Sequence, residues 1–149
     1  MHIFPITSQI AKEQCMEFLA HISDDGRKQT VQEHLEGTAR LCSEFAAEFD
    51  AAEQGYLAGI SHDIGKYTEA FQRRLHGGPK VDHATAGAIE CAKAGFGQAA
   101  VCVIGHHSGL PDMGNERTDQ PGDATFYGRI KKGLMGGIEP YKDNWPGKL

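Results

Sequence analysis

The sequence has no apolar run long enough to span a bilayer, for which about 18 residues are needed. Residues 1–5 lack the basic start of a signal peptide, and no long apolar stretch follows them. Internal repeats and low-complexity tracts are also missing. These absences predict a protein of the cytoplasm that does not enter a membrane.

The chain also lacks an excess of positive charge. It carries 15 Lys and Arg residues against 20 Asp and Glu residues, a formal net charge of −5. This balance argues against a broad basic surface for nucleic acid, although it permits local contact. With 40% hydrophobic and 23% charged residues, the composition is that of a folded globular protein. A length of 149 residues predicts a single domain over residues 1–149.

Cysteine is scarce and shows no Cys-x-x-Cys pair. The four cysteines lie in mostly apolar stretches, which is typical of reduced core residues, and they are Cys15, Cys42, Cys91 and Cys102. We therefore expect neither disulfides nor a zinc ribbon. Cys102 and His106 have a helical spacing that would suit zinc, but a core cysteine is the commoner outcome.

Apolar residues recur at intervals of three and four along most of the chain, which indicates an all-α fold. The clearest predicted helix begins after Thr30, where Thr30 and Glu33 form a capping-box pattern. Its apolar face includes His34 and continues through Leu41, Cys42, Phe45 and Phe49. A second helix over residues 56–64 is expected to end at Gly65 in the left-handed conformation.

Further helices are predicted over residues 68–75 and 82–95, where Thr68 and Asp82 can cap the first turns. The pattern of residues 98–107 fits a buried strand or a buried helix, and the helical neighbours favour a helix. Residues 108–123 are rich in Gly, Pro, Asp and Asn and predict a long loop, with a last helix starting near Thr125. Near the N-terminus, Ile10, Phe18 and Leu19 could belong to one more helix.

Eight histidines are many for so short a chain, and five of them accompany one aspartate at predicted helix ends or faces. These six candidate ligands are His34, His62, Asp63, His83, His106 and His107. A dinuclear metal centre needs ligands that converge from several rigid elements and a carboxylate that can bridge two ions. Asp63 is the natural bridge in such a centre.

The order of these residues also carries a resemblance. His34 followed by His62-Asp63-Ile64-Gly65-Lys66 resembles the HD metal-dependent phosphohydrolase superfamily. Together with residues 29–35, 81–88 and 105–112, this order is similar to the nuclease domain of the CRISPR-associated type I helicase-nuclease. The resemblance covers roughly residues 15–112.

The resemblance implies a compact HD-domain helical bundle with a metal site in its core cleft. It implies a nuclease that cuts single-stranded DNA in CRISPR type I interference, beside a helicase domain and a crRNA-guided surveillance complex. The implied cofactors are one or two divalent transition-metal ions (Fe, Mn, Co, Ni or Zn). His34 and His62 would hold one ion, His83, His106 and His107 would hold the other, and Asp63 would bridge them. Lys66 would act with Asp63 in catalysis, close to the substrate phosphate.

The sequence departs from the superfamily pattern in one respect. The superfamily closes its first metal site with an aspartate from a later apolar helix, which these 149 residues do not show. The remaining aspartates lie in loop-like surroundings, at Asp112, Asp119, Asp123 and Asp143. Either the domain lacks its C-terminal helices here, or the first site is incomplete, or a loop aspartate substitutes.

Other interpretations remain open beside this one. The chain could be an HD-family nucleotide phosphohydrolase, or a catalytically degenerate module that retains metal or supplies an interface. Lys66 could simply be a cation at a helix C-terminus. We expect His2 and His76 to lie outside the site. His21 is expected to be a surface or packing residue, although its nearness to the first motif leaves a site role open. Most of the scattered basic residues are expected to form a solvated face rather than a strand-binding groove, namely Arg73, Arg74, Lys80, Arg129, Lys131 and Lys132.

Overall fold

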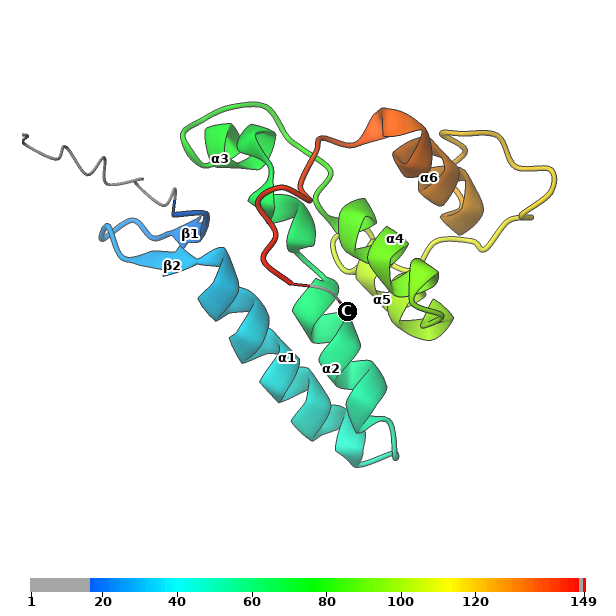
Figure 1. Cartoon of the computed structure of the whole chain (residues 1–149), viewed down its shortest axis with the longest axis horizontal. Coiled ribbons are helices and arrows are strands. Elements are labelled where there is room, and N and C mark those ends of the chain that lie inside the picture. The colour runs from blue at the N-terminus through cyan, green and yellow to red at the C-terminus, as the bar shows by residue number, and fades with distance from the viewer. Residues whose placement is uncertain (1–16, 148) are drawn as a thin grey trace, which may run out of the picture.

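The computed structural model describes residues 17–147 and 149, and it is mostly helical (Figure 1). The helices are α1 (Val31–Ala47), α2 (Ala52–Ser61), α3 (Glu69–Leu75), α4 (Ala84–Lys93), α5 (Gly97–Gly105) and α6 (Phe126–Lys132). A short 3-10 turn, η1 (Ile64–Tyr67), links α2 to α3, and a π turn, η2 (Gly133–Gly137), follows α6. No helix in this part of the chain is long and apolar enough to cross a membrane.

One small sheet corrects the all-α prediction. Strands β1 (Leu19–Ile22) and β2 (Lys28–Thr30) pair antiparallel, with His21 opposite Gln29. Leu19, which the sequence placed in a possible helix, is therefore in a strand, and Phe18 precedes it. Ile10 and Cys15 lie outside the described residues. The hairpin leads directly into α1 and so fixes β1 beside the start of that helix.

Local capping signals fix the helix starts as the sequence predicted. The Thr30 hydroxyl accepts a hydrogen bond from the Glu33 amide, and the Glu33 carboxylate accepts one from the Thr30 amide. Thr68 caps α3 through the Phe71 amide, and the Asp82 carboxylate accepts from the amides of the first turn of α4. These contacts satisfy amides that would otherwise lack a partner.

The helices pack as two pairs, α1 with α2 and α4 with α5, which meet where α2 contacts α5 and α4 (Figure 1). One apolar cluster joins β1, α1, η1 and α4 and is centred on Val31, Leu35 and Ile64. A second joins α4, α5 and α6 and includes Cys91, Ile104 and Phe126. Because α4 contributes to both clusters, it connects the two halves of the domain.

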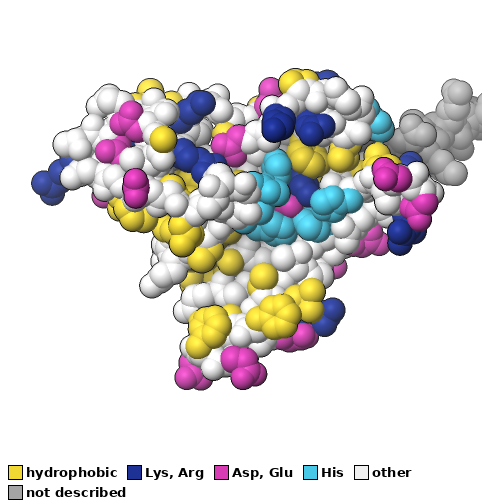
Figure 2. Space-filling view, turned by 180° about the vertical axis from the view of Figure 1, so that it is seen from behind, with side chains coloured by type: hydrophobic (Ala, Val, Ile, Leu, Met, Phe, Trp, Pro, Cys, Tyr) yellow, Lys and Arg dark blue, Asp and Glu magenta, His cyan; other side chains and the backbone are white. Residues whose placement is uncertain are grey.

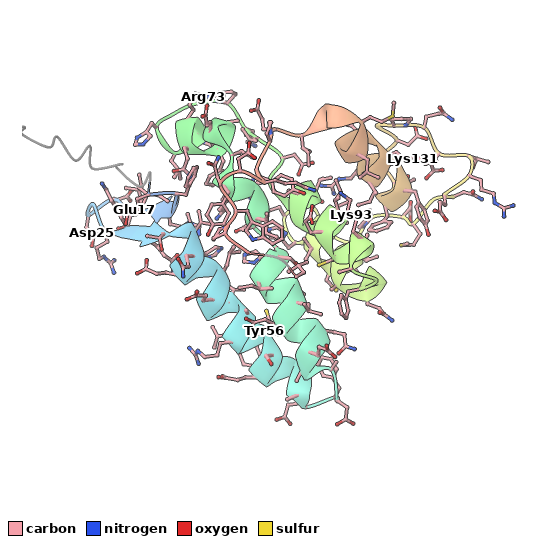
Figure 3. All side chains as sticks on the ribbon, in the orientation of Figure 1. Glu17, Asp25, Tyr56, Arg73, Lys93 and Lys131 are labelled. Carbon is pink, nitrogen blue, oxygen red and sulfur yellow. The ribbon has the colours of Figure 1, made fainter. Side chains whose placement is uncertain are left out.

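The predicted apolar face of α1 is buried only in its first half. Val31 and Leu35 are buried, whereas Leu41, Phe45 and Phe49 are exposed, the last two to 69% and 71%. The helix ends at Ala47, so Phe49 lies beyond it, and Tyr56 of α2 is also exposed on the far part of this helix pair (Figure 3). Helical periodicity identifies an apolar face but does not show whether another element covers it.

Candidate metal centre

Asp63 lies at the centre of the site, at the junction between α2 and η1, and its side chain is 3% exposed. Oδ2 is 2.8 Å from Nε2 of His34, on the second turn of α1, and 3.1 Å from Nε2 of His62, which ends α2. The two imidazole Nε2 atoms are 3.0 Å apart. These three side chains can hold a metal ion on the Oδ2 side of the carboxylate.

The other oxygen of Asp63 faces a second group of histidines. Oδ1 lies 3.4 Å from Nε2 of His83, 3.2 Å from Nε2 of His106 and 3.9 Å from Nε2 of His107. His83 precedes α4, and the adjacent pair follows α5, so the ends of two packed helices supply these rings. The three histidines and Asp63 form a second group that can hold a metal ion.

Backbone contacts orient three of the histidine rings. Nδ1 of His62 lies 2.7 Å from the carbonyl oxygen of Gly59, and Nδ1 of His106 lies 2.6 Å from that of Val103. Nδ1 of His83 lies 3.0 Å from the carbonyl oxygen of Val81. A carbonyl only accepts, so each Nδ1 donates its proton there, and Nε2 is the ring nitrogen left to face the site, where it can bind a metal ion once it carries no proton. This arrangement is typical of metal-binding histidines.

The electrostatics keep Asp63 ionised. Burial alone would raise its pKa, but the ring nitrogens of His106, His34 and His62 outweigh burial and lower the pKa far below its usual range. Burial lowers the pKa of His83, and burial together with the neighbouring histidines lowers that of His107. Burial disfavours the charged form of His106 too, but its contact with Asp63 prevails and raises its pKa. A buried, ionised carboxylate surrounded by imidazole nitrogens suits a divalent cation.

Lys66 and His21 extend the site beyond the six candidate ligands. Nζ of Lys66 is 2.9 Å from Oδ2 of Asp63, and the residue is only 3% exposed although it lies in the last turn of η1. Nε2 of His21 lies 3.2 Å from Nζ of Lys66, and its ring packs edge-on against His34 at 4.8 Å. His21 is thus an exposed residue that packs against the site, and the β1–β2 hairpin places it beside His34 and Lys66.

Gly65 has a different role from the one predicted. It does not adopt the left-handed conformation, and α2 ends four residues earlier, at Ser61. Instead, a Cβ at this position would lie 2.4 Å from the carbonyl oxygen of His83 and 2.5 Å from its Cα. Glycine thus allows η1 to pass directly against the backbone of His83, which brings that ring to Asp63.

The loop aspartates do not complete the first group of ligands. The Asp119 carboxylate accepts a hydrogen bond from the Thr125 hydroxyl, and the Asp123 carboxylate accepts one from the backbone amide of Gln120. Asp112 and Asp143 are exposed. In residues 17–147 and 149, the Oδ2 side of Asp63 offers only His34 and His62 as further metal ligands. The substitution of a loop aspartate is therefore not seen, and the three-histidine side has the fuller set.

The expectation that the cysteines are core residues needs adjustment. Cys102 is exposed rather than part of the core, whereas Cys91 is buried and Cys42 is half-buried. All three are free thiols, in agreement with the absence of disulfides predicted for them, and Cys102 joins no group of metal ligands in the described part of the chain. His76 is exposed and lies outside both groups, as expected, and His2 lies outside the described residues.

A cavity of about 730 Å³ opens beside the three-histidine side of the site. His83, His107 and Lys66 line it where it meets the candidate ligands. A substrate in this cavity would touch the centre from the side where the rings are most exposed, because the His107 side chain is 58% exposed.

Comparison with known proteins identifies the family. A search of curated proteins found no match. The family model of the HD domain matches residues 31–132, which include all six candidate ligands. HD domains bind divalent metals and are generally metal-dependent hydrolases, which agrees with the histidines grouped around a buried aspartate. The match covers more than half of the chain, and the chain therefore belongs to the HD domain family.

Proposed function

We propose that this protein is a metal-dependent nuclease that hydrolyses phosphodiester bonds of single-stranded DNA. The observation that carries the proposal is the position of Asp63, whose two oxygens face two separate groups of imidazole nitrogens. This geometry supports a centre for two ions bridged by one carboxylate. When bound, such ions supply an activated water near neutral pH and neutralise charge on the phosphoryl oxygens.

The chain's own residues then have distinct roles in the proposal. His34 and His62 bind on one side of Asp63, and His83, His106 and His107 bind on the other. The carbonyl contacts of His62, His83 and His106 fix the orientation of these rings, so that Nε2 of each faces the centre. Lys66 lines the cavity and contacts Asp63, so its ammonium can hold a substrate phosphate against the centre.

The proposed partners follow from the motif order together with the charge of the chain. The resemblance to the CRISPR type I helicase-nuclease suggests a helicase that supplies single-stranded DNA and a crRNA-guided complex that selects the target. A net charge of −5 gives little general attraction for DNA, which favours delivery of the strand by a partner.

A second candidate function, hydrolysis of nucleotides by an HD-family phosphohydrolase, is favoured by the cavity. Its volume of about 730 Å³ and its partly apolar walls would accept a free nucleotide. A panel of nucleoside phosphates assayed beside a DNA strand separates the two functions by which substrate is turned over. A degenerate module would instead bind metal and turn over neither.

The decisive experiment is cleavage of circular single-stranded DNA with added manganese, cobalt, nickel or iron. The parent protein should cut the circle, and a chelator or Asp63→Asn should abolish cutting. Asp24→Asn is the matched control, because Asp24 is exposed on the turn between β1 and β2 and should leave cutting unchanged. Circular dichroism must show that both variants are folded. A folded, metal-loaded parent that cuts nothing would contradict the nuclease proposal.

A further inference from the structure

The cavity beside the candidate metal centre has one apolar wall and a set of cations. The apolar wall consists of Phe71 and Leu75 from α3 and Val81 from the segment before α4. Four basic side chains line the same cavity, namely Lys66, Arg74, Lys80 and Arg129. Figure 2 shows the histidines gathered on one face of the molecule, with apolar and basic side chains next to them. Cations beside an apolar surface suit a ligand with both an anionic and an apolar part.

Two of these four cations are already engaged by the protein. Lys66 pairs with Asp63 at 2.9 Å. Arg129 lies 3.6 Å from Asp82 and donates to the carbonyl oxygen of Ile104 at 2.8 Å. Their charges are thus largely compensated, and their positions are fixed by contacts within the fold.

The other two cations are not compensated in this way. Within residues 17–147 and 149, no carboxylate lies within 4.0 Å of Arg74 or Lys80, and neither side chain donates a hydrogen bond to another of these residues. Arg73, the neighbour of Arg74 on α3, lies 3.8 Å from Glu69 and does not line the cavity. Both side chains are exposed, so these two cations, which line the cavity without an ion-pair partner among the described residues, are accessible to a ligand there.

We propose that the cavity is a subsite for the nucleotide next to the bond that is cut. The apolar wall contacts the base or sugar of that nucleotide, and Arg74 and Lys80 bind its far phosphate. This inference rests on the proposed nuclease function and deepens it, because the substrate must then carry a second phosphodiester. A single diester would occupy only the metal centre, whereas a strand would occupy both.

The test is binding of a fluorescent ten-nucleotide thymidine strand, measured by anisotropy in a chelator over a series of salt concentrations. The double variant Arg74→Ala with Lys80→Ala should raise the Kd about tenfold, because charge-assisted contacts to phosphate are lost. The slope of log K against log salt should fall by about 0.7, the value for one phosphate of a single strand.

The matched control removes the same charge elsewhere, with Arg73→Ala and Arg40→Ala. Both arginines are exposed, both pair with a glutamate on their own helix, and Figure 3 shows Arg73 on the outer side of α3. This control should bind as the parent does. An equal Kd and slope for the two double variants would overturn the subsite.

A parallel titration with thymidine triphosphate tests the class of ligand. If only the triphosphate loses affinity in the Arg74 and Lys80 variant, the cavity takes a free nucleotide and the strand subsite is wrong. Because the binding assay needs no turnover, its outcome is independent of whether the protein cuts DNA. If the protein binds the strand through Arg74 and Lys80 but does not cut it, the proposed nuclease function is wrong and the proposed subsite is supported.

Discussion

Gly65→Ala should damage one half of the metal centre through a single backbone contact. The new Cβ would lie 2.5 Å from Cα of His83, about 1 Å closer than the ~3.5 Å at which nonbonded carbon atoms pack. Cα of His83 is a backbone atom and the new Cβ is fixed to the backbone of residue 65, so no side-chain rotation can relieve the contact. The segment before α4 must therefore move by a distance on the order of 1 Å, and Nε2 of His83 moves away from Oδ1 of Asp63.

The expected cost of this overpacking is about 1–3 kcal/mol of unfolding free energy. Metal analysis of the purified variant should show loss of the ion on the His83 side, and cleavage should fall about 100-fold, the effect of a 1 Å displacement on a positioned group. Gly37→Ala is the matched control, because nothing lies within 4 Å of a Cβ there and alanine favours the interior of α1. If Gly65→Ala keeps the parent's metal content and thermal stability, the close approach does not position His83.

Three further predictions concern stability and pH. Thr30→Ala removes the cap of α1 and should cost about 1 kcal/mol, a fall in Tm of about 2–4 °C in thermal unfolding. Burial alone would raise the pKa of Asp82, but hydrogen bonds from Thr85 and the charge of Arg129 outweigh burial and lower it. The ionised carboxylate therefore stabilises the fold above its usual pKa of 3.8, and this stabilisation is lost progressively as the pH falls below that value. In Asp82→Asn, the free energy of unfolding should therefore depend less on pH below 3.8 than it does in the parent. An unchanged pH dependence would contradict this role of Asp82. Metal should be released as pH falls through about 6, because imidazole ligands must be neutral, and an unchanged metal content at pH 5 would contradict imidazole ligation.

Features set by neighbouring residues could be predicted from the sequence. The capping box at Thr30 and the cap at Thr68 depend on contacts three residues away, and both are as expected. Gly95, the expected end of the helix predicted over residues 82–95, lies two residues after α4 and has φ of 87°. The loop over residues 108–123 likewise contains no helix or strand.

Features set by distant residues could not be predicted. The strand at Leu19 forms only because residues 28–30 pair with it, and three or four residues carry too little pattern to show this. That pairing also brings His21 to Lys66, so the contact between these two side chains could not be predicted from the sequence. Gly65 illustrates the same limit. Its motif is visible in the sequence, but glycine is needed there because the backbone of His83, eighteen positions further along the chain, leaves no room for a Cβ. The six candidate ligands were identified from the sequence, and the structure brings the five histidines around the carboxylate of Asp63.

The sharing of Asp63 has a consequence for how the centre fills. One carboxylate supplies the only negative charge among the six candidate ligands, so a cation held on either side reduces the attraction that the other side offers. If both sides bind an ion, we therefore expect their occupancy to be negatively cooperative, and by thermodynamic reciprocity each ion would weaken the binding of the other by the same factor. The number of ions per chain would then depend on the free metal concentration, and a preparation with one equivalent would represent the first step of a two-step titration.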